Sequence, residues 1–281
     1  MPYMDFFTQP VTTLLLRSRR FKQAFPRRAW KRGKFILVII SLTCSKSFAF
    51  QQTKSNPEDF VKGREILKKA IEAAGGVAAF DEIDNFRIKT ESKIFGQRST
   101  IELVVSETVK LPDKTKQIFE LATGQRIQVL NGEIGWSKTG ETVTEISNAE
   151  MREMKRGLFR DTINLFKRFD GASIDVQYLG KETIQKNTLF ILNIKNNSGD
   201  FFKLYVNSKT YLIEKKSYHG GGPEMAILAT LEEIYSDYHE VDGLKIPFHT
   251  VVKANGKKFI ESNVVEVEFN LELGDGFFMR E

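Results

Sequence analysis

The stretch Ser236 to Phe248, S-D-Y-H-E-V-D-G-L-K-I-P-F, decides how the second half of the chain folds. Two segments that alternate apolar and polar residues, 234–241 and 244–248, flank the dipeptide Asp242-Gly243. Asp-Gly between such segments is the strongest short-range signal for a β-hairpin. Pro247 has no N–H to donate, so we expect the outgoing strand to lie at a sheet edge or to have Pro247 among its first residues.

Short strands are predicted on both sides of this hairpin. Turn signals such as Asn131-Gly132 and Asn255-Gly256 separate them, and nothing between neighbouring strands is helical enough for a parallel crossover. The sequence therefore predicts a mainly β (α+β) fold with an antiparallel meander of about 10–11 strands. The expected strand segments are 88–91, 101–111, 117–121, 126–130, 135–138, 142–145, 174–178, 189–194, 201–206, 211–217, 226–235 and 259–269.

Two helices interrupt the strands. The first follows Asn56-Pro57-Glu58, which supplies a capping side chain and a Pro at the first helical position, and it ends at Gly75-Gly76. The second starts at Ser147, which forms a capping box with Glu150, and is expected to run to about Phe169. Its apolar face carries Met151, Met154, Leu158, Thr162, Leu165, Phe166 and Phe169.

Charge is distributed unevenly along the 281 residues. Residues 1–49 hold ten of the 42 Lys and Arg but one of the 36 acidic residues, which leaves 32 bases and 35 acids in the rest. The body therefore lacks the excess of basic charge that nucleic-acid binding needs. The basic segment 27–34 precedes an apolar run, 35–44, and the small residues of Ser47-Phe48-Ala49, which predicts a secretory signal over 1–49 with a long basic n-region.

A membrane anchor is the alternative interpretation of this leader, although about 20 apolar residues are needed to span a bilayer. Cys44 is the only cysteine and lies within the leader, so the expected mature chain, 50–281, forms one domain without disulfides.

Signatures of catalysis and metal binding are incomplete. The segment 219–222, H-G-G-G, resembles the oxyanion loop of lipases and esterases, but the G-x-S-x-G nucleophile motif is absent. Three histidines occur without metal-ligand spacing, and Asp237, Glu240 and Asp242 are better explained as solvated turn residues than as a cation site. We therefore expect no enzyme activity, no cofactor and no metal, with a hydrolase using His219 as the weaker alternative.

Three segments together carry a family resemblance: Ala73-Ala74-Gly75-Gly76, Asn131-Gly132 to Gly135-Trp136, and 237–248. With the order of helices and strands, they resemble the periplasmic outer-membrane lipoprotein-sorting (LolA/LolB-like) superfamily. The resemblance implies an unclosed antiparallel β-barrel whose concave face is covered by helices, with an apolar hollow between them. It also implies that 236–248 is a barrel-closing hairpin, and that a basic residue, Arg87, Lys89 or Arg98, tethers the helical lid.

The function that the resemblance implies is a periplasmic carrier or sensor in a Gram-negative-type envelope. It would hold the acyl chains of a lipoprotein or lipid and contribute to outer-membrane lipoprotein sorting. We expect it to bind no nucleic acid and to act as a monomer. The alternative is a non-catalytic envelope protein that binds a protein partner with the same scaffold. The candidate ligand-binding residues are Met151, Met154, Leu158, Leu165, Phe166 and Phe169 of the central helix, with Trp136, Ile101, Leu103 and Val105 of the strands.

Overall fold

The structure, a computed structural model, describes residues 56–96, 99–184, 186–220 and 229–280. The leader expected over 1–49 lies outside these residues. The helices are α1 (Pro57–Ala74), α2 (Val77–Asp81), α3 (Asn148–Arg160) and α4 (Thr162–Lys167). The strands are β1 (Asn85–Phe95), β2 (Thr100–Lys110), β3 (Lys114–Leu121), β4 (Gly124–Asn131), β5 (Ile134–Thr139), β6 (Thr142–Glu145), β7 (Ile174–Ile184), β8 (Asn187–Asn196), β9 (Phe201–Asn207), β10 (Ile213–Gly220), β11 (Ala229–Val241), β12 (Leu244–Ala254) and β13 (Lys257–Phe269).

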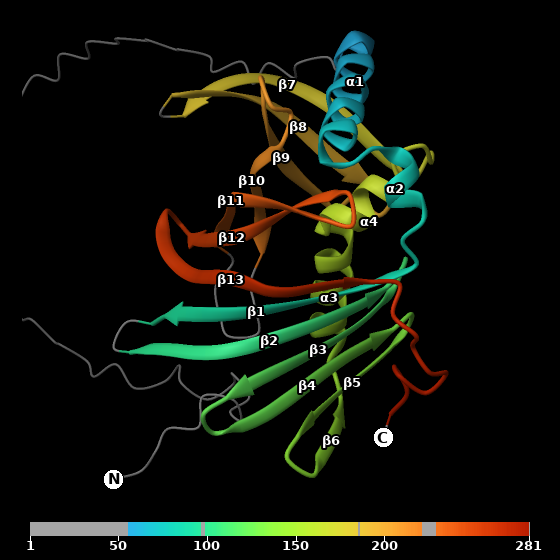
Figure 1. Ribbon diagram of the computed structural model, residues 1–281, viewed down its shortest axis with the longest axis vertical. Helices are drawn as coiled ribbons and strands as arrows, with labels where there is room; N and C mark the ends of the chain where they lie inside the picture. The colour runs from blue at the N-terminus through green and yellow to red at the C-terminus, as the bar shows by residue number, and fades with distance from the viewer. Residues whose placement is uncertain (1–55, 97–98, 185, 221–228, 281) are drawn as a thin grey trace, which may run out of the picture. The chain divides into compact units, whose positions relative to one another are not determined.

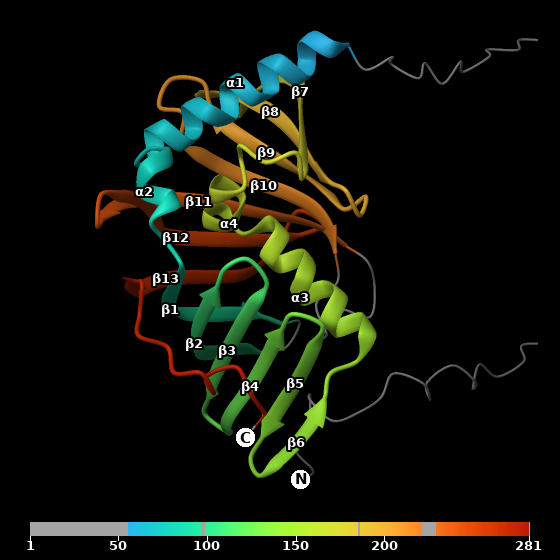
Figure 2. The ribbon, with the colours of Figure 1, turned by 90° about the vertical axis from the view of Figure 1, so that its right-hand side faces the viewer.

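All the described strands form one antiparallel sheet with the order β6-β5-β4-β3-β2-β1-β13-β12-β11-β10-β9-β8-β7. The sheet curves around α3 and α4 but does not close, because β6 and β7 remain as its two edges (Figures 1 and 2). This confirms the predicted unclosed, mainly β fold. The strand count is 13 rather than 10–11. Each predicted segment, together with the outgoing hairpin strand 244–248, corresponds to one of these strands, so the segments were located and only their expected total was too low.

The Asp242-Gly243 hairpin is confirmed and joins β11 to β12. Asp242 and Gly243 have φ values of 49° and 80°, as a two-residue turn with a positive φ at both positions requires. Pro247 is the fourth residue of β12 and pairs with Tyr238 of β11, whereas the pairing of β12 with β13 begins only at His249. The hairpin lies inside the sheet, so the expectation that it closes a barrel is wrong: the open edges belong to β6 and β7.

Helix α1 packs on the β7 end of the sheet (Figure 2). Asn56 caps it by accepting a hydrogen bond from the backbone N–H of Glu58. Gly63 allows the close approach, because a Cβ added there would lie 2.5 Å from the carbonyl oxygen of Val176. Arg64 holds the neighbouring backbone by donating hydrogen bonds to the carbonyl oxygens of Phe169 and Ile174, at 3.0 and 2.9 Å.

The central helix differs from its prediction, because it is two helices rather than one. The capping box of Ser147 and Glu150 starts α3 as expected. At Asp161 the backbone adopts φ −59° and ψ 132°, which is not helical, and α4 starts anew with the Asp161 carboxylate accepting a hydrogen bond from the N–H of Asn164 at 2.7 Å. An Asp that caps the next turn competes with the continuing helix, which explains the break.

The main core lies between the helices and the concave face of the sheet. It joins α1, α4 and the strands β7 to β9 through buried apolar side chains, among them Leu67, Ile71, Leu165, Leu192 and Phe202. Two pairs of aromatic rings pack edge-to-face in this core. The ring centroids of Phe80, on α2, and Phe166 are 5.1 Å apart, and those of Phe159 and Phe202 are 5.3 Å apart. Within the described part of the chain, no helix is both long and apolar enough to cross a membrane.

Candidate ligand cavity

A cavity of about 380 Å³ lies between the concave face of the sheet and the helices α3 and α4. Its wall combines apolar and polar side chains from both halves of the sheet. The apolar members are Ala70, Ala74, Phe80, Ile88, Val109, Leu158, Ile163, Phe166, Leu212, Ile213, Ile246, Pro247 and Val264. The polar members are Thr90, Glu107, Gln117, Arg160, Asp161, Thr162, Lys216, Tyr218, Glu233, Tyr235, Tyr238, Lys245 and Thr250.

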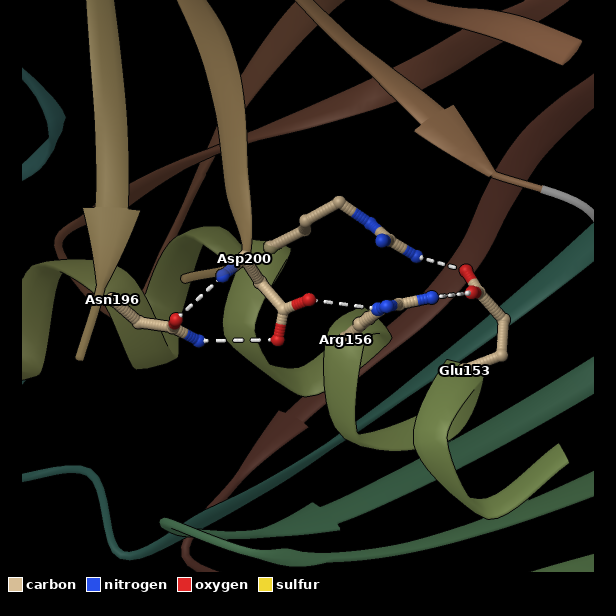
Figure 3. Close-up of polar contacts among 5 residues, drawn as sticks. Glu153, Arg156, Asn196 and Asp200 are labelled. Atoms are coloured by element: carbon tan, nitrogen blue, oxygen red, sulfur yellow. Dashed lines mark hydrogen bonds and ion pairs between the residues drawn. The ribbon is translucent and has the colours of Figure 1, made fainter. Parts of the chain in front are cut away.

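Polar contacts connect the middle of α3 to the turn between β8 and β9 (Figure 3). Arg156 donates a hydrogen bond from Nε to Asp200 Oδ1 at 2.8 Å, and its Nη1 lies 3.6 Å from Glu153 Oε2. Asn196 accepts a hydrogen bond from the backbone N–H of Asp200 at 2.9 Å, and its Nδ2 donates one to Asp200 Oδ2 at 3.5 Å. These side chains are partly exposed, so the contact positions the helix but adds little stability, on the order of 1 kcal/mol or less.

The C-terminal end of α3 is fixed more firmly, by a residue of the sheet. Lys216 of β10 is buried, with 4% of its surface exposed, and its Nζ donates a hydrogen bond to the carbonyl oxygen of Arg160 at 2.6 Å. The Arg160 guanidinium lies over the Tyr218 ring at 4.0 Å and pairs with Glu153 at 2.7 Å. The junction of α3 and α4 is therefore held by a charged residue of the sheet.

Glu233 of β11 is the negative partner in this cluster. Its carboxylate accepts hydrogen bonds from the hydroxyl groups of Tyr218, at 2.6 Å, and Tyr235. Burial alone would raise the pKa of Glu233, but Lys216 and the two hydroxyl groups outweigh burial and hold that pKa below its usual value. Burial lowers the pKa of the Lys216 ammonium. The two opposite charges therefore stabilise each other in a place that disfavours either one alone.

Glu107 of β2 occupies a different environment on the facing part of the wall. Gln117 and Thr115 donate hydrogen bonds to its Oε1 at 2.8 and 3.1 Å. Burial raises the pKa of Glu107, and the carboxyl groups of Asp161 and Glu233 raise it further. Burial also raises the pKa of Asp161, against the opposing effect of Lys216. Two carboxyl groups of the cavity thus hold protons more strongly than usual.

The raised pKa of Glu107 predicts a pH dependence of stability. The folded protein keeps a proton on Glu107 that the unfolded chain releases above about pH 4.5, its usual pKa. The stabilisation from this proton is complete below that pH and is lost as the pH rises through the raised pKa. We expect Glu107→Gln to gain stability relative to the unmodified protein as the pH rises from 4.5 towards neutrality. Urea unfolding across this range measures the difference, and parallel curves would contradict the prediction.

The residues predicted for the ligand site are distributed over three environments. Leu158 and Phe166 line the cavity. Leu165 and Phe169 are buried in the main core, and Met151 and Met154 pack against it while remaining partly exposed. Ile101, Leu103 and Val105 alternate along β2 in step with Glu107 and Val109, so they lie on the concave face beyond the cavity. Ligand binding by these residues remains a proposal.

Trp136, also predicted for the ligand site, lies on the other face of the sheet. Gly135 pairs with Leu130 of the main core, so the next residue, Trp136, points to the opposite face of the sheet. There it packs with Val129 and Phe278, and its indole Nε1 donates a hydrogen bond to the carbonyl oxygen of Phe278 at 3.3 Å. The C-terminal segment thus covers this face. We therefore leave Trp136 out of the proposed ligand site.

Of the three basic residues expected to tether the helices, the two that the structure describes make no described contact with α3 or α4. Arg87 pairs with Glu268 on the neighbouring strand β13, and Arg98 lies outside the described residues. Lys89 lies on β1, two residues after Arg87, and has no described contact with α3 or α4. Lys216, in the second half of the sheet, makes the hydrogen bond to α3. Its sequence context, Lys215-Lys216-Ser217, resembles a solvent-exposed strand, so no local signal separated it from Lys215.

The histidines and acids of the weaker alternatives make ordinary local contacts. His219 Nδ1 lies 3.2 Å from Thr230 Oγ1 on the adjacent strand, and Gly221 and Gly222 of its motif lie outside the described residues. His239 Nε2 lies 2.9 Å from Asp237 Oδ1, and its ring stacks on Phe248. Among the residues that the structure describes, no three His, Asp or Glu side chains gather closely enough to hold a metal ion.

Comparison with known proteins gives matches of structure but not of sequence. No protein-family model and no curated protein matches the sequence. A LolA superfamily protein from Nitrosomonas europaea superposes with a TM-score of 0.53 at 13% identity, covering 78% of this chain and 97% of that one. A DUF1329 family protein from Desulfovibrio piger gives 0.53 at 12% identity, with the same coverage of 78% and 97%.

A third structure, described as an outer membrane lipoprotein-sorting protein domain and coming from Vibrio parahaemolyticus, gives a TM-score of 0.52 at 13% identity. It also covers 78% of this chain and 97% of its own. Identities this low bear on the arrangement of the backbone and not on what is bound. The three superpositions, together with the open 13-stranded sheet and the helices on its concave face, show that this chain has a LolA-like fold.

Proposed function

We propose that this protein is a non-catalytic carrier or sensor that binds the acyl chain of a lipoprotein or lipid in the cavity beneath α3 and α4. The cavity itself carries the proposal. Its volume of about 380 Å³ falls in the range of small-molecule sites, about 300–1,000 Å³. Burial of a methylene group yields roughly 0.8 kcal/mol, so about ten carbons yield on the order of 8 kcal/mol, which corresponds to micromolar affinity.

Release of such a ligand requires α3 to move, and the contact of its middle suits that requirement, whereas its end stays attached to the sheet through Lys216. Arg156 and Asp200 join α3 to the sheet through partly exposed side chains, which separate in water at little cost. Leu158 and Phe166 line the cavity and lose apolar contacts when the helices move away. A bound acyl chain would replace these lost contacts. The ligand then shifts the balance between closed and open states by its differential affinity for them.

The proposed location is the periplasm of a Gram-negative-type envelope, and the proposed role is a contribution to outer-membrane lipoprotein sorting. The secretory leader expected over 1–49 supports the location. The fold shared with a LolA superfamily protein and with a lipoprotein-sorting protein domain supports the role. We propose that the protein acts as a monomer.

Filling the cavity provides the test of this function. Thr250 lies on the cavity wall, so a phenylalanine at this position would occupy the space that an acyl chain needs. We expect Thr250→Phe to lower the affinity for a fluorescent fatty-acid probe by about tenfold or more, the equivalent of roughly 1.4 kcal/mol. Val251 follows it on the same strand and points to the opposite face, so Val251→Phe should bind the probe normally.

Equal probe affinity of both variants would remove this cavity from the site. Native mass spectrometry of gently purified protein adds an independent measurement, because a carrier should retain lipid. Repeated lipid-free preparations together with no displacement of the probe would contradict acyl-chain binding.

The second candidate function is a non-catalytic envelope protein that binds a protein partner. Three large lid side chains favour it, because Phe159, Leu165 and Phe169 are buried in the core and fill much of the space beneath the helices. A scaffold filled in this way could present its outer surface rather than its interior. Failure of the probe to bind the unmodified protein, with the fold intact by circular dichroism, would favour this second function.

A further inference from the structure

Several charged groups of the cavity wall act on groups of opposite charge, and Lys216 acts on both Glu233 and Asp161. Glu233 is matched by Lys216 and by two tyrosine hydroxyl groups, and Arg160 is matched by Glu153 outside the cavity. Glu107 has amide and hydroxyl donors but no cation among the described groups that act on it. The charges that act on Glu107 are the carboxyl groups of Asp161 and Glu233. One position on the wall therefore carries an acid without a counter-charge.

The geometry around Glu107 leaves one of its oxygen atoms available. Gln117 and Thr115 both donate to Oε1, which orients the carboxyl group from the neighbouring strand β3. Among the described residues, none donates a hydrogen bond to Oε2. Because Glu107 lines the cavity, this oxygen is the acceptor that a bound molecule can reach. Asp161, at the junction of α3 and α4, adds a second carboxyl group to the same cavity.

A ligand with a positively charged N–H group would supply the counter-charge that Glu107 lacks. It would also donate a hydrogen bond to Glu107 Oε2. Charge-assisted hydrogen bonds of this kind are shorter and stronger than those between neutral groups. A carboxylate at the polar end of a ligand would instead face the Glu107 carboxyl group, on which the carboxyl groups of Asp161 and Glu233 already act. The wall thus discriminates between ligands that have the same alkyl chain but different polar ends.

We propose that the cavity takes an amphiphile whose polar end is a protonated primary amine, and that the Glu107 carboxylate binds this ammonium group. The apolar side chains of the wall, such as Val109 and Leu158, take the alkyl chain. Glu107 is then the residue that determines headgroup specificity. This inference rests on the proposed function, because it requires that the cavity binds an alkyl chain.

The test compares dodecylamine, dodecanol and dodecanoic acid, each below its aggregation limit at neutral pH, as competitors of a fluorescent alkyl probe whose polar end is uncharged. We expect the amine to bind about tenfold or more tightly than the alcohol, and the acid more weakly than the alcohol. Dodecyltrimethylammonium has the charge without an N–H donor, and we expect it to bind more weakly than the amine. An amine that binds no better than the alcohol overturns this inference and leaves the proposed function standing. Failure of every dodecyl compound to bind overturns both.

A variant locates the effect. Glu107→Gln keeps the shape of the side chain and removes its charge, so the amine should fall to the affinity of the alcohol while the alcohol is unchanged. Glu120→Gln is the matched control, because Glu120 is exposed on the neighbouring strand β3 and faces away from the cavity. A preference for the amine that persists in Glu107→Gln overturns the assignment. The comparison of headgroups on the unmodified protein decides the proposal even where the variant is unstable.

Discussion

Replacement of Lys216 by methionine is expected to lower the free energy of unfolding by about 3 kcal/mol or more, the usual effect of removing one partner of a buried charge pair. Methionine fills a similar volume, so the loss comes from charge and hydrogen bonding rather than from packing. Glu233 would keep its tyrosine donors but lose the ammonium that holds its pKa down. The carbonyl oxygen of Arg160, at the end of α3, would lose its donor as well.

Two further variants separate this explanation from a general sensitivity of the sheet. Lys203→Met, on the adjacent strand β9, changes an exposed lysine and should alter the free energy of unfolding by less than about 0.5 kcal/mol. The double variant Lys216→Met, Glu233→Gln removes both charges and should recover part of the loss. Urea unfolding measures all three and also the single variant Glu233→Gln, which the comparison requires. A double variant that is as unstable as the sum of its two single variants would contradict the coupling.

The sequence contained enough information for the fold because the fold depends on local signals. The two-residue turn at Asp242-Gly243 and the capping box at Ser147 each depend on neighbours within a few residues, and each is present in the structure. The break between α3 and α4 is a local signal that the helical periodicity concealed. Asp161 is a good capping residue, but the apolar spacing continues across it to Leu165 and Phe166, so periodicity alone predicted one helix.

The charged side of the cavity could not be predicted in the same way. Lys216 and Glu233 face each other only because β10 and β11 pair in one register, which aligns these two residues directly. Glu107 reaches the same cavity from β2, in the other half of the sheet, through the curvature that brings both halves under α3 and α4. Such contacts depend on register and curvature. Each of these residues, taken in its own segment, resembles the polar position of a half-exposed strand.

A second large effect is expected at Gly63, where α1 lies closest to β7. A Cβ at this position would meet the carbonyl oxygen of Val176 at 2.5 Å and the backbone nitrogen of Tyr178 at 3.0 Å. Both atoms belong to the backbone of β7, so the clash cannot be relieved by rotation of a side chain. We expect Gly63→Ala to lower the free energy of unfolding by about 1–3 kcal/mol, the cost of overpacking, in spite of the better helix propensity of alanine.

Gly157 of α3 provides the opposite case within the same chain. Apart from the helix's own backbone and the chain neighbours, no atom of the described residues lies within 4 Å of a Cβ added there, so Gly157→Ala should gain the helix propensity without a clash and stabilise the protein by about 0.5–1 kcal/mol. Thermal unfolding of both variants should therefore show shifts of opposite sign. Two shifts of the same sign would mean that helix propensity or a common change in the unfolded chain dominates. Opposite signs would show that α1 is seated directly on the backbone of β7, whereas the position of Gly157 on α3 has room for a side chain.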